Sequence, residues 1–196
     1  QVIITEIADP NNNASARFVE LTNIGQDSFD LTGYNLIRWT NEKPDPTGSG
    51  ADLSSYGPVA PGDVLTFAKS SSTFESVYGF AATAQLTTGG VTDSNGDDQI
   101  ALRNVTTIYD IFGVIGEDGS GTAHEFENGR AERKSTVTAP NATWDASEWN
   151  VDNDSGGGDG AQDAPAGYDP GQWIGLSVGN DPTIAVGSNV TGLDYF

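Results

Sequence analysis

The sequence predicts an all-β protein, a sandwich of two antiparallel sheets with long capping loops and at most one short helix. Short runs rich in β-branched and aromatic residues recur along the chain, and Asp, Asn, Pro and Gly bound them, which is typical of strands and turns. The chain contains 25 Gly and 9 Pro, a content suited to many tight turns. No long helical period is present, and a length of 196 residues suits one sandwich domain.

The opening of the chain predicts three strands, which are Val2–Ala8, Phe18–Asn23 and residues 29–36, with 37–39 extending the third. The first two each carry one glutamate among apolar neighbours, Glu6 and Glu20. Burying a bare carboxylate is costly. We therefore expect both glutamates to face water, a cation or a partner.

The middle of the chain predicts a strand at Val64–Ala68, then a short helix within residues 70–78 capped by one of three serines at 70–72. Gln99–Asn104 and residues 107–114 are two strand-like runs joined by a few polar residues, which predicts a hairpin. Further short strands are expected at Val91 and at 131–135.

The last third predicts mostly irregular structure over residues 139–173, with aromatic side chains at intervals. Long loops that carry their own aromatics usually pack against the core as caps. Strand character returns at 173–178, 183–186 and 190–196.

The net charge of the chain argues against two classes of binding partner. Eight basic against 28 acidic residues give a net charge of −20. Nucleic-acid binding through the phosphate backbone needs clustered Lys and Arg, and only Arg130, Arg133 and Lys134 lie close in sequence. We therefore expect no direct nucleic-acid binding by this domain. Anionic membrane surfaces are disfavoured for the same reason. The acidity favours solubility and cation binding.

Processing and location are also predicted from the sequence. The chain has no Cys, and no apolar run approaches the length of a membrane span, so neither a disulfide framework nor membrane insertion is expected. We interpret Gln1 as the mature end left after removal of a signal peptide, which predicts an extracellular protein. The alternative is a piece of a longer chain.

Short motifs follow one another in a set order along residues 1–150. They are TEI at 5–7, FVELTN at 18–23, DLTGYNL at 30–36, VAPGD at 59–63, GDDQIAL at 96–102, YDIFG at 109–113, RAERKS at 130–135, and Trp144 with Trp149. This order resembles the lamin-tail domain, in the form found in secreted bacterial proteins. The resemblance implies an immunoglobulin-like β-sandwich over residues 1–150. Residues 151–196 lie beyond it and are expected to form an acidic, Gly-rich loop and a strand-like extension, packed on the same domain or exchanged from it.

Catalysis is not expected. A Ser-His-Asp triad or a histidine-based nuclease needs a histidine as base, and the single candidate is His124. No nucleophile motif accompanies it, and no second histidine offers a zinc pair. The lamin-tail resemblance likewise implies a module rather than a reaction.

Calcium is the one expected cofactor, because acidic, Gly-containing loops supply the oxygen ligands that it prefers. Two loops are candidates, and a third site is the end of the opening strands. Each group also fits a solvated turn, since Asp, Asn and Gly favour turns for backbone reasons. The residues of the first loop are Asp93, Asn95, Asp97 and Asp98; those of the second are Asp152, Asp154, Asp159 and Asp163; those of the third are Asp9, Asn11, Asn13 and Glu20.

Two functions from different classes remain. The first is a non-enzymatic structural or adhesive module that assembles into an extracellular polymer through edge strands, whose partners are its own copies or other cell-surface proteins. The second is an accessory domain that binds substrate or partner for a secreted hydrolase such as an extracellular nuclease, which the lamin-tail resemblance implies.

Overall fold

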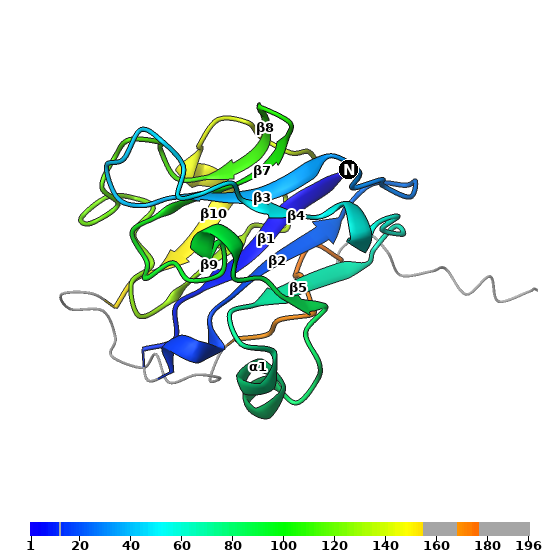
Figure 1. Cartoon of the computed structure of the whole chain (residues 1–196), viewed down its shortest axis with the longest axis horizontal. Helices are drawn as coiled ribbons and strands as arrows, with labels where there is room; N and C mark the ends of the chain where they lie inside the picture. Colours follow the sequence, from blue (N-terminus) through cyan, green and yellow to red (C-terminus); the bar gives the residue numbers. More distant parts are fainter. Residues whose placement is uncertain (12, 155–167, 177–196) are drawn as a thin grey trace, which may run out of the picture.

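The protein folds into two β-sheets that pack against each other (Figure 1). The structure is a computed structural model, and it describes residues 1–11, 13–154 and 168–176. The larger sheet has six strands in the order β10-β9-β1-β2-β5-β6. Its neighbours pair antiparallel except β5 and β6, which run parallel. The strands are β1 (Val2–Ala8), β2 (Phe18–Asn23), β5 (Val64–Ala68), β6 (Ala84–Gln85), β9 (Arg130–Arg133) and β10 (Trp149–Asp152).

The smaller sheet has four antiparallel strands in the order β4-β3-β7-β8. They are β3 (Tyr34–Trp39), β4 (Ala51–Asp52), β7 (Gln99–Asn104) and β8 (Thr107–Phe112). Because β7 and β8 are joined by two residues, they form a tight hairpin at one edge of this sheet. Of the helices in the described ranges, none combines the length and apolar character needed to span a membrane.

The main core lies between the sheets and follows the alternation of the strands. Leu36 of β3, Ile100 and Leu102 of β7 and Leu21 of β2 are fully buried there. In β1 the register shifts between Ile4 and residue 6, so inward and outward positions change over at this point. The shift turns the glutamate of β1 toward the outer face of the larger sheet.

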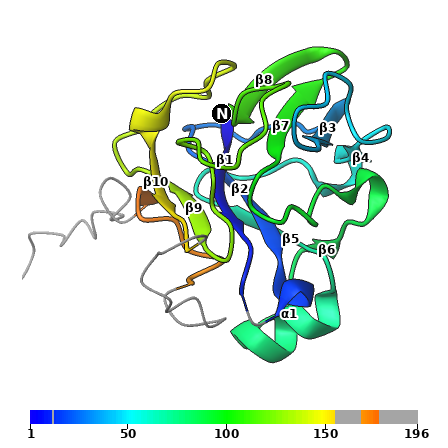
Figure 2. The same cartoon turned by 90° about the vertical axis from the view of Figure 1, so that its left-hand side faces the viewer.

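A second, smaller cluster lies on that outer face. Helix α1 (Ser71–Tyr78) buries Phe74 against Phe18 of β2, with ring centroids 5.7 Å apart. The Ser70 hydroxyl accepts the Thr73 N–H and caps the helix start, as expected. Both cartoons show α1 at one end of the larger sheet (Figures 1 and 2).

The predicted all-β sandwich is confirmed, and the opening strands, the serine-capped helix and the β7–β8 hairpin lie where they were expected. Several details differ, among them the two-residue strands β4 and β6, which were not expected. The third strand begins at Tyr34, and Phe29 makes only an isolated bridge to Val59. Val91 is buried without forming a strand. Trp149–Asp152 is a strand that was expected to be irregular. Residues 173–176 form no strand, and the other expected C-terminal strands lie outside the described residues.

Candidate functional site

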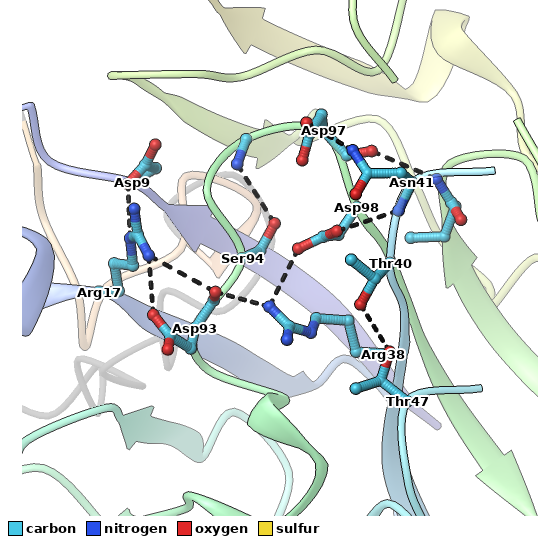
Figure 3. A network of polar contacts seen from close by, with 12 residues as sticks. Asp9, Arg17, Arg38, Thr40, Asn41, Thr47, Asp93, Ser94, Asp97 and Asp98 are labelled. Carbon is cyan, nitrogen blue, oxygen red and sulfur yellow. Dashed lines mark hydrogen bonds and ion pairs between the residues drawn. The ribbon is translucent and has the colours of Figure 1, made fainter. Parts of the chain in front are cut away.

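The first predicted calcium loop is held by cationic side chains (Figure 3). Asp93 Oδ1 lies 2.7 Å from Arg17 Nη1 and 2.6 Å from Lys69 Nζ. Asp98 Oδ2 lies 3.0 Å from Arg38 Nη1, which also donates to the Asp93 carbonyl at 2.6 Å. These ion pairs fix the loop between β2, β3 and β5 and occupy two of its carboxylates.

The pKa values of Asp93 and Asp98 shift in opposite directions. Burial acts to raise the pKa of Asp93, but hydrogen bonds from Lys69 and Arg17 outweigh it and leave the pKa lowered. The pKa of Asp98 is raised, because burial outweighs the charge of Arg38. Figure 3 shows Asp97 on the side of Asn41, whose Nδ2 donates to Asp97 Oδ2 at 2.8 Å. Asp93 and Asp97 therefore face different partners.

Of the other two calcium candidates, the structure describes all four residues of the third and only two of the second. Asp152 lies in β10 opposite Arg130, and Asp159 and Asp163 lie outside the described residues. In the third candidate, Asp9 pairs with Arg17 at 2.6 Å, whereas Glu20 is buried beside Glu6. Over the described ranges, no group of three or more His, Cys, Asp or Glu residues is arranged to hold a metal ion. Calcium binding stays a prediction.

Three glutamates stand side by side across neighbouring strands of the larger sheet. Glu6 of β1 pairs in register with Glu20 of β2 and with Glu132 of β9. Their exposed fractions are 1%, 0% and 7%. Of the three surroundings expected for Glu6 and Glu20, exposure to water is therefore excluded, and the structure shows a cation beside Glu6 and polar partners for Glu20. The nearest counter-ion is Arg130, whose Nη1 lies 3.0 Å from Glu6 Oε1.

Residues 168–176 lie on the outer face of the larger sheet, where the glutamates are buried. The Gly171 N–H donates to Glu20 Oε2 at 2.6 Å, and Asp169 pairs with Arg130 at 2.5 Å. Trp173 Nε1 donates to the carbonyl of Arg133 at 2.7 Å. Both cartoons show this orange segment on the side of the sheet away from the smaller sheet (Figures 1 and 2). The segment thus caps the sheet, as the aromatics of this region predicted.

Burial raises the pKa of all three glutamates. Burial is the largest cause for Glu6, whose pKa rises well above its usual range; Glu20 raises it further and Arg130 opposes the rise. Burial raises the pKa of Glu20 to about 7, against hydrogen bonds from Thr5 and Gly171. Two carboxylate oxygens, Glu6 Oε2 and Glu132 Oε1, are buried without a hydrogen-bond partner. The three glutamates therefore bind their protons more tightly than exposed glutamates do.

A groove of about 320 Å³ opens between the end of α1 and the cap. Its walls are aromatic, with one carboxylate and one amide. The residues that line it are Val77, Tyr78, Phe80, Tyr168, Asp169, Pro170 and Gln172.

His124 has no catalytic surroundings in the described part of the chain. Its side chain is 1% exposed, and its ring packs against Phe112 and Trp144. Burial lowers its pKa, although Glu117 opposes the change. The Thr122 hydroxyl, which donates to the Gly119 carbonyl, lies 3.0 Å from His124 Nδ1. The His124 imidazole therefore packs as a buried side chain of the loop after β8.

Comparison with known families agrees with this geometry. The family model of the Lamin Tail Domain matches residues 1–116, from β1 through β8. The chain belongs to the lamin-tail family. No curated protein matches it. The family is one of non-catalytic, immunoglobulin-like folds, so the expected fold and family are both confirmed. The lamin-tail match ends before β9, although β9 and β10 complete the larger sheet.

Sequence reasoning predicted a cap in this region of the lamin-tail protein, but it located neither the glutamates that the cap covers nor the groove. The sequence feature that indicated a covered face was the pair of glutamates, Glu6 and Glu20, inside apolar strands. Such carboxylates need a polar partner when they are buried. Nothing in the local sequence indicates that the cover lies 151 residues from Glu20.

Proposed function

We propose that this lamin-tail domain is a non-catalytic, extracellular structural module that associates with copies of itself through the outer edge of β8. The main support for this contact is the length of the β8 edge. The other sheet edges are β4 and β6, with two residues each, and β10, with four, whereas β8 has six. An edge strand presents unpaired backbone groups that another strand can satisfy.

In the part of the chain that the structure describes, the outer side of β8 is open over its first half. Within the described residues, the backbone bond on that side is from the Ile111 N–H to the Asn141 carbonyl at 3.1 Å. Thr107 is exposed, and the strand contains neither Lys nor Pro, the residues that usually protect an edge. The preceding turn carries Val105, which is 69% exposed. These features support strand pairing between copies at the hairpin.

The acidity of the chain supports the extracellular part of the proposal, because a net charge of −20 keeps an exported protein soluble. The same charge means that copies repel one another. Association through β8 should therefore strengthen as salt screens this repulsion.

The test compares two variants that add the same positive charge at exposed positions. Thr107→Lys places a lysine on the β8 edge, and Gln26→Lys places one in the β2–β3 loop. Light scattering after size exclusion, at 0.05 and 0.5 M salt, should show concentration-dependent association of the wild type and of Gln26→Lys. Thr107→Lys should need at least about tenfold higher concentration.

A wild type that stays monomeric at millimolar concentration would rule out self-association. In that case the second function, an accessory binding domain of a secreted hydrolase, gains support from the modular character of the lamin-tail family. Equal association of the two lysine variants would instead place the contact away from β8.

A further inference from the structure

The groove beside α1 has three aromatic walls, contributed by segments far apart in the sequence. Tyr78 and Phe80 come from the end of α1 and the following turn, and Tyr168 comes from the cap. Phe80 is 38% exposed, yet its ring is held in place, edge-on against Phe74 with centroids 5.1 Å apart. Gly171 also approaches it closely enough that a Cβ there would meet the ring at 3.0 Å. The walls are therefore preorganised.

The polar lining of the groove is anionic. Its one carboxylate belongs to Asp169, whose side chain is 43% exposed. The pKa of Tyr78 is raised by burial first and then by the charge of Glu6. The pKa of Tyr168 is raised by burial and then by the charges of Asp152 and Asp9. A ring face beside a carboxylate attracts a cation.

The molecule already binds one cation in this way from the inner side. The guanidinium carbon of Arg130 lies 5.9 Å from the centroid of the Tyr168 ring, and Arg130 Nη1 lies 2.5 Å from Asp169 Oδ1. The same tyrosine and aspartate also line the groove. Their chemistry thus suits a second cationic side chain on the outer side.

We propose that this groove binds a lysine or arginine side chain from a basic segment of a partner protein. The net charge of −20 draws such a segment toward the domain, and the aromatic walls hold the apolar stem of its side chain. An apolar ligand would remove the exposed part of the Asp169 carboxylate from water and leave it only its ion pair with Arg130, which costs free energy. The proposal is independent of association through β8, because no residue of β8 lines the groove.

The experiment titrates the full chain with three pentapeptides that differ only at the central residue, which is lysine, acetyl-lysine or norleucine. Binding is followed by amide chemical shifts in 0.15 M salt, which screens non-specific attraction to an acidic protein. The lysine peptide should shift the amides of Phe80, Tyr168 and Gln172. The acetyl-lysine and norleucine peptides, and glucose as a neutral stacking ligand, should bind at least about fivefold more weakly, because they lack the charge.

Two groove variants and one control complete the test. Phe80→Ala removes an exposed wall and should weaken lysine binding at least about fivefold. Val77→Lys places a competing ammonium in the wall and should abolish it. Val114→Ala trims another exposed apolar side chain and should change nothing. Circular dichroism checks that each variant folds.

Three results would overturn the proposal. One is the absence of groove shifts with the lysine peptide. Another is equal binding of the lysine and norleucine peptides, or of glucose. The third is a folded Val77→Lys variant that binds as tightly as the wild type.

Discussion

The guanidinium of Arg133 and the carboxylate of Asp110 form a fully buried ion pair that joins the two sheets. Arg133 lies in β9 and Asp110 in β8, both are 0% exposed, and two nitrogen–oxygen pairs stand at 3.2 Å. Asp110 also accepts the N–H groups of Ile4 and Asn141 at 2.8 Å. Arg133 further pairs with Glu148 at 2.6 Å and stacks on Trp149. One pair thus connects β1, β8, β9 and the segment before β10.

Arg133→Met should destabilise the domain strongly. It leaves Asp110 buried without a cation, and breaking one partner of a buried pair costs about 3–5 kcal/mol. Asp110→Asn added to Arg133→Met should recover part of the loss, because the carboxylate charge is gone. Urea denaturation measures the free energy of unfolding. Lys134→Met is the control, since this neighbouring cation is only half-buried, and its loss should cost less than about 1 kcal/mol.

Stability should fall as pH rises through neutrality. Glu20 has a pKa of about 7 in the folded protein against 4.5 for an ordinary glutamate. A raised pKa means that the folded state binds the proton more tightly, so the stabilisation is full below pH 4.5 and is lost as pH passes through 7. Glu6 and Glu132 shift in the same direction and face the same counter-ion, Arg130. For Glu20 the loss is on the order of 3 kcal/mol.

Urea denaturation at pH 5, 6, 7 and 8 checks this dependence. Glu20→Gln cannot ionise and should flatten the profile, with its largest gain over the wild type at pH 8. Glu75→Gln changes an exposed glutamate of α1 and should leave the profile as it is. A wild type whose stability is constant or increases from pH 5 to 8 would contradict the prediction.

Strands with strong local patterns were predictable from the sequence, and those defined by distant partners were not. Val2–Ala8 and Gln99–Asn104 are β-branched or alternating runs bounded by turn residues, so local preference and burial agree. Trp149–Asp152 has a polar sequence and becomes a strand because Arg130–Arg133 offers it a pairing edge. That pairing depends on tertiary contacts, which override weak local preference.

The candidate site was less predictable for a related reason. The loop around Asp93 and Asp98 has the composition both of a calcium loop and of an ordinary turn. The partners of these carboxylates are Arg17 and Arg38, which lie 76 and 60 residues away. Likewise, the burial of Glu20 depends on a cap at the other end of the described chain. Composition indicates which groups are charged, but tertiary structure decides what they pair with.

Val105→Asn should stabilise the hairpin between β7 and β8. Val105 has a φ of +52°, a left-handed conformation that crowds a β-branched side chain, and it sits in a two-residue turn. Asn tolerates this conformation, so the change should raise the free energy of unfolding by about 1 kcal/mol, or the melting temperature by about 2–4 °C. Val114→Asn is the control, because Val114 is also exposed but is not left-handed. Equal melting temperatures of the two variants would contradict the strain at Val105.

Two glycines with positive φ separate the cost of backbone strain from that of steric contact. Gly96 has a φ of +106°, and a Cβ there would lie 2.2 Å from the Cα of Glu127. Gly121 has a φ of +76° and open space within 4 Å. Gly121→Ala should therefore cost only the conformational penalty of about 1–2 kcal/mol. Gly96→Ala should cost clearly more, since the loop before β7 must move away from the loop before β9. Thermal unfolding of the two alanine variants measures the difference, and equal losses would mean that the two loops are not in close contact.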